Sequence, residues 1–539
     1  MRTKVLCFIL LCFSLNVKGQ VKTEGPKLVV GIMVDQMRWD YLYKYANRYG
    51  ADGFKRMLRE GFTCENTYIP YAQTVTACGH ASVYTGSVPA INGIMGNDWW
   101  DRQQGRMVYC VEDQSVKVLG GGPKAEPMSP KNMTVTSMCD ELRLATNFKA
   151  KVIGIAIKDR GGILPAGHTA NAAYWYDGST GNWVSSTHYM SSLPTWVNGF
   201  NSRKVTDSLM KKSWSTLYPI ETYTMSDPDD KAYEGKFSNE DKPVFPHKVN
   251  EFVGKNYTEI ANTPYGNTLT FEFAKQAVLS EGLGNDDVTD FLAVSFSSPD
   301  YIGHKFGPNS IEVEDTYLRL DQELAAFFKF LDSKFGKNYT VFLTADHGVA
   351  NSPAYSRVNK LPGGATNPAT SEAVKNTISK FGLKNFIENF SNYQVYLNRR
   401  AIDSAKLNFQ EIKAYFIEQL NKDASIHYAF DNDKISDAHL PGNVKERFVN
   451  GLHPKLGGDI QVIMKSGYYP WNNEGTGATH GAWYAYDAHI PFVLMGWGIN
   501  KGVLHRNVYM SDIAPTICSL LRIQMPSGNV GNAVGEAIR

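Results

Sequence analysis

Six short apolar runs, most of them continuous rather than alternating, constrain the fold of this chain more than any other feature. Such runs are typical of strands that are buried on both faces of a mainly parallel sheet. Because the carboxyl ends of parallel strands meet at one edge of the sheet, polar residues that follow them can converge on one pocket. The predicted strands are Leu28–Val34, Val152–Ile157, Phe291–Phe296, Tyr339–Thr344, Ile460–Met464 and Pro491–Met495.

Helical patterns lie between these runs, as in Ala51–Glu60, Leu269–Leu279 and Ile311–Phe335. Alternation of strands and helices predicts an α/β fold, with a doubly wound, mainly parallel sheet sandwiched by helices. Two long regions, 169–264 and 350–458, break the alternation. We interpret both as insertions that cap the polar edge of the sheet, within one domain that spans residues 20–539.

The first 19 residues have the pattern of a secretory signal peptide. Arg2 and Lys4 precede an apolar stretch at 5–15, and Gly19 offers a small-residue cleavage site before Gln20. The apolar stretch is too short to span a bilayer. We therefore expect a secreted or periplasmic protein with no membrane insertion.

Charge and cysteine content narrow the class of protein further. Removal of residues 1–19 takes three cations and no acid, so the formal charge moves from +2 to −1. A near-neutral protein has no electrostatic case for a nucleic acid partner. The remaining cysteines show no CxxC spacing, and their odd number leaves at least one unpaired in a monomer, while one or two disulfides stay open. They are Cys64, Cys78, Cys110, Cys139 and Cys518.

Two candidate site residues are ambiguous when they are taken singly. Asp35 directly follows the run Leu28–Val34, where a carboxylate can bind a metal, although a loop or capping aspartate is the more common role. Thr76 stands at the start of an apparent helix in QTVTACGHASVYTGSVP. Free N–H groups there favour a phosphate, but a plain N-cap explains the isolated motif better.

Histidines and further aspartates follow other strands. Asp300 and His304 are four residues apart, so one helical turn sets both on one face, which suits a zinc ion. Asp346 and His347 form a compact pair at the end of TVFLTADHG. His480 lies in the turn TGATHG, where a lone histidine is usually structural. Three histidines and three aspartates in such contexts, together with Thr76, predict a two-metal site beside a hydroxyl nucleophile.

The order and context of these segments resemble the alkaline phosphatase superfamily. The resemblance implies two Zn²⁺, one held by Asp300, His304 and His480 and the other by Asp35, Asp346, His347 and the nucleophile Thr76. The T-x-x-x-H pattern of Thr76–His80 is similar to the nucleophile segment of the phosphodiesterase/nucleotide pyrophosphatase branch. SDIAPTICSLL is similar to the closing helix of the superfamily. The absence of C-x-P-x-R argues against a formylglycine sulfatase.

Three more residues indicate which branch of the superfamily the chain resembles. Asn97 in GIMGNDWW, with Lys158 and Arg160 in VIGIAIKDRGG, resembles the PafA-type, phosphate-irrepressible alkaline phosphatases. Taken alone, K-x-R is most often a solvated edge. The resemblance implies that all three hold phosphoryl oxygens, and two cations favour a monoester over a diester because it carries more negative charge.

We therefore expect a monomeric alkaline phosphatase that hydrolyses small phosphate monoesters through a phosphothreonyl intermediate. Two alternatives remain open: a phosphodiesterase or nucleotide pyrophosphatase with the same metals, and a metal-dependent phosphate-binding protein without turnover.

Overall fold

The fold is built on strands that the apolar runs predict. The computed structural model describes residues 25–470 and 476–539. The central strands have no exposed position, as expected for strands covered on both faces. They are β1 (Leu28–Val34), β6 (Val152–Ala156), β9 (Asp290–Phe296) and β10 (Tyr339–Thr344). The predicted signal peptide at 1–19 lies outside the described residues.

These strands are the centre of one large mixed sheet. Its order is β17-β2-β18-β10-β1-β9-β6-β7-β8-β5, and β19 pairs with β2. The run from β10 to β7 is parallel, whereas β18 is antiparallel to β10 and β8 is antiparallel to β7. The outer strands are β2 (Phe62–Tyr68), β5 (Val118–Leu119), β7 (Ala172–Asp177), β8 (Asn182–Ser186), β17 (His489–Ile490), β18 (Phe492–Gly496) and β19 (Gly502–Tyr509).

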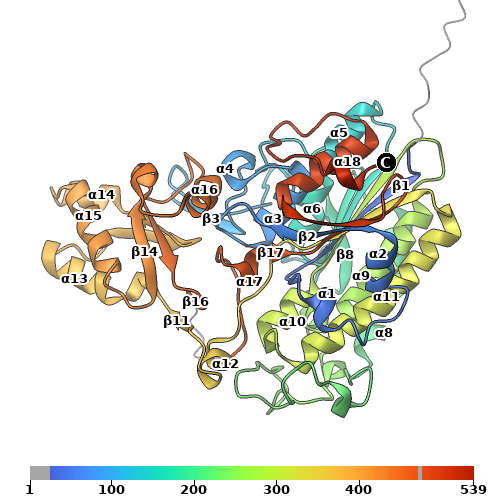
Figure 1. The fold of residues 1–539 in the computed structure, drawn as a ribbon, viewed down its shortest axis with the longest axis horizontal. Coiled ribbons are helices and arrows are strands. Elements are labelled where there is room, and N and C mark those ends of the chain that lie inside the picture. Colours follow the sequence, from blue (N-terminus) through green and yellow to red (C-terminus); the bar gives the residue numbers. More distant parts are fainter. Residues whose placement is uncertain (1–24, 471–475) are drawn as a thin grey trace, which may run out of the picture.

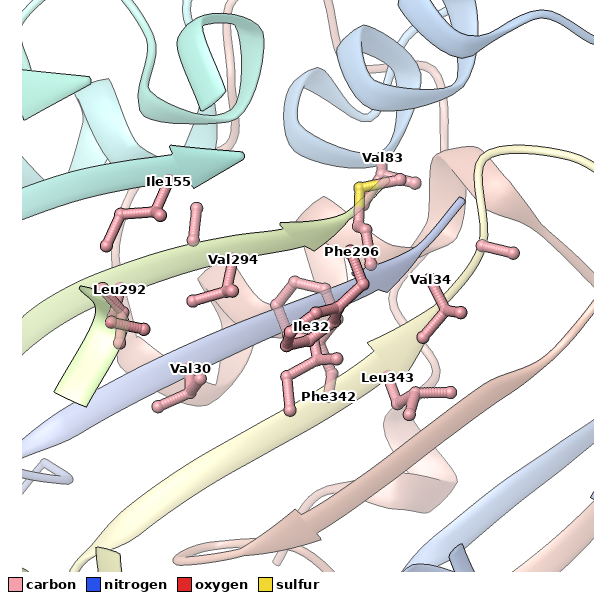
Figure 2. Close-up of a cluster of buried hydrophobic side chains, with 14 of the residues drawn as sticks. Val30, Ile32, Val34, Val83, Ile155, Leu292, Val294, Phe296, Phe342 and Leu343 are labelled. Atoms are coloured by element: carbon pink, nitrogen blue, oxygen red, sulfur yellow. The ribbon is translucent and has the colours of Figure 1, made fainter. Parts of the chain in front are cut away.

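Helices cover both faces of the sheet, which confirms the predicted α/β class (Figure 1). One face carries α3 (Thr76–Thr85), α5 (Met138–Ala145), α6 (Asp159–Ala166) and α18 (Ile513–Leu521), and the other carries α2 (Phe54–Glu60), α9 (Tyr265–Ser280) and α11 (Ile311–Phe335). Figure 2 shows Val83 of α3 above the interleaved side chains of the central strands, such as Ile32 and Phe296. All three are fully buried, so the core reaches the strand ends where the polar residues begin.

The structure differs from the sequence prediction in how it uses the first long region, 169–264. Its opening strands, β7 and β8, extend the main sheet instead of covering it. The remainder is mostly loops with short helices, among them α7 (Thr195–Ser202) and α8 (Val205–Met210). Predicting this region as an insertion from residue 169 was therefore wrong at its start, because these short, aromatic strands lack the long aliphatic run that marks the central strands.

The second region, 350–458, and the strand that follows it at 460–464 form a lobe beside the main sheet (orange in Figure 1). Its four-stranded antiparallel sheet has the order β12-β13-β15-β14. A separate hydrophobic cluster, which includes Leu397, Phe416 and Val462, lies between this sheet and helices α13 and α15. The elements are α13 (Glu372–Phe381), β12 (Ile387–Ser391), β13 (Gln394–Leu397), α15 (Phe409–Leu420), β14 (Ile426–Asp431) and β15 (Ile460–Met464).

Ile460–Met464 is a strand as predicted, but assigning it to the main sheet was wrong, since it is β15 of the small sheet. A buried apolar run predicts a strand but does not predict which strands it pairs with.

The five cysteines of the described residues are all buried free thiols, so no disulfide joins them. They are Cys64, Cys78, Cys110, Cys139 and Cys518. Within 25–470 and 476–539, no helix has the length and apolar character that crossing a bilayer requires.

Candidate active site

The predicted site residues meet at the carboxyl edge of the central strands. Asp35 follows β1, the Asp346–His347 pair follows β10, and Asp300 with His304 lies on α10 (Ser298–Phe306) directly after β9. Thr76 is the first residue of α3. His480 arrives from the chain that returns from the second lobe, so segments far apart in sequence supply one pocket.

One cluster consists of Asp300, His304 and His480. The Nε2 atoms of the two histidines are 3.2 Å apart, and Asp300 Oδ1 lies 3.2 Å from His304 Nε2 and 3.5 Å from His480 Nε2. The Nδ1 atoms are 2.7 Å from the carbonyl oxygens of Ala478 and Thr74. Each Nδ1 is therefore the donor, which leaves both Nε2 lone pairs facing one carboxylate, an arrangement that a cation satisfies.

The second cluster surrounds His347. Its Nδ1 donates to the Gly348 carbonyl at 2.9 Å, so the Nε2 lone pair faces Asp35 Oδ1 at 3.5 Å, Asp346 Oδ2 at 3.4 Å and Thr76 Oγ1 at 3.5 Å. Burial lowers the pKa of His347 to about 3, so the ring is neutral. Burial and the nearby Asp346 carboxylate raise the pKa of Asp35. The second cluster therefore gathers two carboxylates, a neutral imidazole and a hydroxyl, all of which can donate a lone pair to a cation.

Unpartnered oxygens in the second cluster also fit a cation. Asp35 Oδ1 and Asp346 Oδ2 are buried and accept no hydrogen bond from any described residue. His80 Nδ1 lies 3.3 Å from Asp346 Oδ2 but is aligned on the carbonyl of Thr76 at 2.9 Å. Burying such oxygens without partners is costly. Carboxylate and imidazole donors without thiolate suit zinc, and Asp300 lies within reach of both clusters, since its oxygens group with Asp35 and His347 as well.

Lys158 joins the two clusters. It follows β6, and its Nζ lies 2.8 Å from Asp35 Oδ2, 2.5 Å from Asp300 Oδ2 and 3.4 Å from Thr76 Oγ1. Burial opposes the charge, but Asp300 and Asp35 outweigh it and raise the pKa of Lys158, so the ammonium stays protonated. Against burial, the Lys158 ammonium helps to hold the pKa of Asp300 well below its usual range.

The other two predicted phosphate-binding residues lie close by. Asn97 Oδ1 accepts a hydrogen bond from the Ala77 amide at 3.0 Å, beside the first turn of α3. Arg160 is in the first turn of α6, and its Nη1 donates to Tyr109 Oη at 3.0 Å. The structure therefore brings Thr76, Asn97 and Lys158 around the start of α3, with Arg160 following Lys158 on the adjacent helix.

Sequence reasoning missed residues that orient the site. Gln36 is buried, its backbone N–H donates to Asp346 Oδ1 at 3.1 Å, and its side chain donates to Asp300 Oδ1 at 2.6 Å. Asp487 Oδ2 accepts from the amides of Gly481 and Ala482, which holds the turn that carries His480. A polar residue directly after the strand-ending Asp35 was a usable signal for Gln36, whereas nothing local marked Asp487.

Comparisons with known proteins show the family of this chain and its fold. The family model described as type I phosphodiesterase / nucleotide pyrophosphatase matches residues 29–484. Alkaline phosphatase PhoV of Synechococcus elongatus is 50% identical over 100% of both chains. A protein of Myroides odoratus named calcium-transporting ATPase is 50% identical over 99% of this chain and 98% of its own.

Alkaline phosphatase PafA of Elizabethkingia meningoseptica is 47% identical over 96% of each chain. A crystal structure of wild-type PafA matches this structure with a TM-score of 0.92 at 46% identity, over 96% of this chain and 99% of that one. The family and the fold that the motifs predicted are confirmed. The chain therefore belongs to the type I phosphodiesterase / nucleotide pyrophosphatase family, in the branch that contains the PafA-type alkaline phosphatases.

Proposed function

We propose that this chain is a zinc-dependent alkaline phosphatase that hydrolyses phosphate monoesters through a phosphothreonyl intermediate on Thr76. Whole-length relatives named alkaline phosphatases support the enzyme class. One observation supports the mechanism most directly: Thr76 Oγ1 lies 3.5 Å from His347 Nε2 in the second cluster and 3.4 Å from Nζ of Lys158, which contacts both clusters.

Asp300, His304 and His480 would hold one zinc ion, and Asp35, Asp346 and His347 with Thr76 would hold the other. When bound, two zinc ions supply Lewis-acid charge that lowers hydroxyl pKa values and balances charge on departing oxygen. The histidines contribute Nε2 lone pairs because their Nδ1 atoms are committed to backbone carbonyls.

The reaction proceeds in two displacements at phosphorus. Thr76 Oγ forms a bond to phosphorus while the ester P–O bond breaks, and the alcohol leaves. A water then attacks the phosphothreonine, which releases inorganic phosphate and restores the hydroxyl. Lys158, Arg160 and Asn97 bind the phosphoryl oxygens in both steps, and the two cations favour the charge of a monoester.

The nucleophile is tested by acid-quenching enzyme during turnover of an aryl phosphate and locating phosphate by mass spectrometry. Wild type should carry it on Thr76, and Thr76→Ala should carry none while keeping its zinc content and thermal unfolding midpoint. Phosphate on another residue would overturn the assignment. Equal kcat/KM on a matched aryl diester would favour the phosphodiesterase alternative, which the family model also represents.

We further propose that residues 20–539 form a single catalytic domain that works as a secreted or periplasmic monomer on small phosphate monoesters, with no nucleic acid partner. N-terminal sequencing of the native protein should begin near Gln20. Sedimentation at micromolar concentration should give the mass of one chain.

A further inference from the structure

We propose that Tyr109 is a positioning residue that aims Arg160 at the phosphoryl group, and that its hydroxyl contributes to monoester preference through this arginine. Tyr109 ends strand β4 (Arg106–Tyr109), which forms a hairpin with β3 (Asp98–Asp101). The inference rests on the proposed function of Arg160 as a phosphate-binding cation.

The hydroxyl of Tyr109 belongs to a closed hydrogen-bonded ring. It accepts from Arg160 Nη1 at 3.0 Å and donates to Asp159 Oδ1 at 2.5 Å, and the same carboxylate oxygen accepts from the Arg160 backbone N–H at 2.6 Å. Both hydrogen-bonding functions of the hydroxyl are therefore used, which fixes its orientation. Burial, with Asp159 nearby, raises the pKa of Tyr109, so the phenol keeps its proton in alkaline solution.

A neutral hydroxyl is a suitable partner for a cation that must bind phosphate. Among the described residues, the Arg160 guanidinium forms no salt bridge, and its one hydrogen bond is to Tyr109. A directly bonded carboxylate would orient the guanidinium but would also cancel its charge. Tyr109 orients it without that loss, while Asp159 acts one bond further away.

The hairpin that carries Tyr109 is held firmly. The Cys110 amide donates to the Asn97 carbonyl at 2.9 Å, which closes its base. On the side of the second lobe, Arg102 Nη2 donates to the buried Asp459 at 2.6 Å, and Asn392 Nδ2 donates to the Asp98 carbonyl at 2.7 Å. One hairpin thus connects Asn97 with the support of Arg160.

The test is Tyr109→Phe, which removes only the hydroxyl. We expect kcat/KM for an aryl phosphate monoester to fall about five- to twenty-fold. The inhibition constant of inorganic phosphate should rise by a similar factor. The kcat/KM for a matched aryl diester should change by less than about two-fold, because Lys158 and Arg160 contribute less to diester turnover. Tyr49→Phe is the control, since the Tyr49 hydroxyl donates to the Tyr41 carbonyl at 2.9 Å.

A double-mutant cycle separates positioning from general packing. In an Arg160→Ala background, Tyr109→Phe should change monoester kcat/KM by less than about two-fold. The same loss in both backgrounds, or an equal loss on the diester, would overturn the inference. If Arg160→Ala itself leaves monoester turnover intact, the proposed function of Arg160 fails, and this inference fails with it. If Arg160→Ala lowers monoester turnover but Tyr109→Phe does not, the function of Tyr109 proposed here fails and the proposed function of Arg160 stands.

Discussion

At the scale of single residues, the direction of each hydrogen bond decides what the site can hold. His304, His347 and His480 each commit Nδ1 to a backbone carbonyl. Their Nε2 atoms consequently face carboxylates as acceptors. A protein that kept this site without a cation would bury opposed lone pairs, which is unfavourable. The tautomers therefore favour a metal centre over a network of internal hydrogen bonds.

The first prediction concerns metal content. His480→Ala should lose about one of the two zinc equivalents and most of the activity. The first cluster then keeps only Asp300 and His304 as ligands, whereas the second cluster keeps all of its own. Elemental analysis after gel filtration measures this directly. His439→Ala is the matched control, as this histidine is exposed on the second lobe. Unchanged zinc in the His480 variant would contradict the ligand set.

The second prediction concerns ester choice. Lys158→Ala with Arg160→Ala should lower monoester kcat/KM far more than diester kcat/KM. Each contact is worth on the order of 2–4 kcal/mol in the transition state, or roughly one to three decades in rate. Steady-state kinetics on matched aryl esters, at unchanged zinc content, measures the ratio. Equal losses on both esters would show that these cations do not set specificity.

At the scale of elements, the close approach of α3 to the end of β10 brings Thr76 to the metal ligands. Gly79 permits it: an added Cβ would lie 2.4 Å from Asp346 O and 2.5 Å from Asp346 Cβ. No side chain fits there without moving the helix or the strand end. The glycine one turn into α3 therefore sets the distance between the nucleophile and the Asp346–His347 pair.

The third prediction follows from that contact. Gly79→Ala should cost about 1–3 kcal/mol of folding free energy from overpacking. A displacement near 1 Å should lower kcat roughly a hundredfold. Gly199→Ala in α7 is the control, because an added Cβ there meets nothing within 4 Å. The control should be neutral or slightly more stable. Full activity of Gly79→Ala would contradict the packing argument.

At the scale of the whole molecule, a buried charged cluster ties the first long loop region to α11. His247 Nδ1 lies 3.1 Å from Glu240 and its Nε2 lies 3.2 Å from Glu312, the second residue of α11. Against burial, these carboxylates raise the pKa of His247 to about 9. Burial and the nearby Glu312 raise the pKa of Glu234 to about 9 as well.

The fourth prediction is the pH dependence of stability. Between pH 4.5 and about 9, folded Glu234 keeps a proton that the unfolded chain releases, so folding stability falls as pH rises. The stabilisation from His247 is complete below pH 6.5 and is lost between pH 6.5 and about 9. Glu234→Gln should therefore lose less stability from pH 6 to 9.

Thermal unfolding at fixed zinc concentration measures this difference. The fall in Tm between pH 6 and 9 should be smaller in Glu234→Gln by roughly 1–3 °C. Glu418→Gln is the control, since Glu418 forms an exposed pair with Lys422. An identical fall in Tm for wild type and Glu234→Gln would show that this carboxyl is ionised in the folded protein.

Local sequence patterns predicted much of the fold. Continuous apolar runs predicted β1 and β10 with the bounds that the structure shows, and helical periodicity predicted Ile311–Phe335. The candidate site was readable because strand ends carry its ligands, and because family motifs give an order for residues such as Thr76 and His480. These signals lie within a few residues, where sequence determines conformation directly.

Only the tertiary structure decided which sheet each strand joins and which polar groups support the site. Ile460–Met464 has the same apolar character as a central strand, yet it pairs in the second lobe. Tyr109 and Asp487 gain their functions from partners that other segments bring to them. The sequence by itself determined the elements and the chemistry at their ends. Pairing and support depend on long-range burial and hydrogen-bond geometry, which no local pattern encodes.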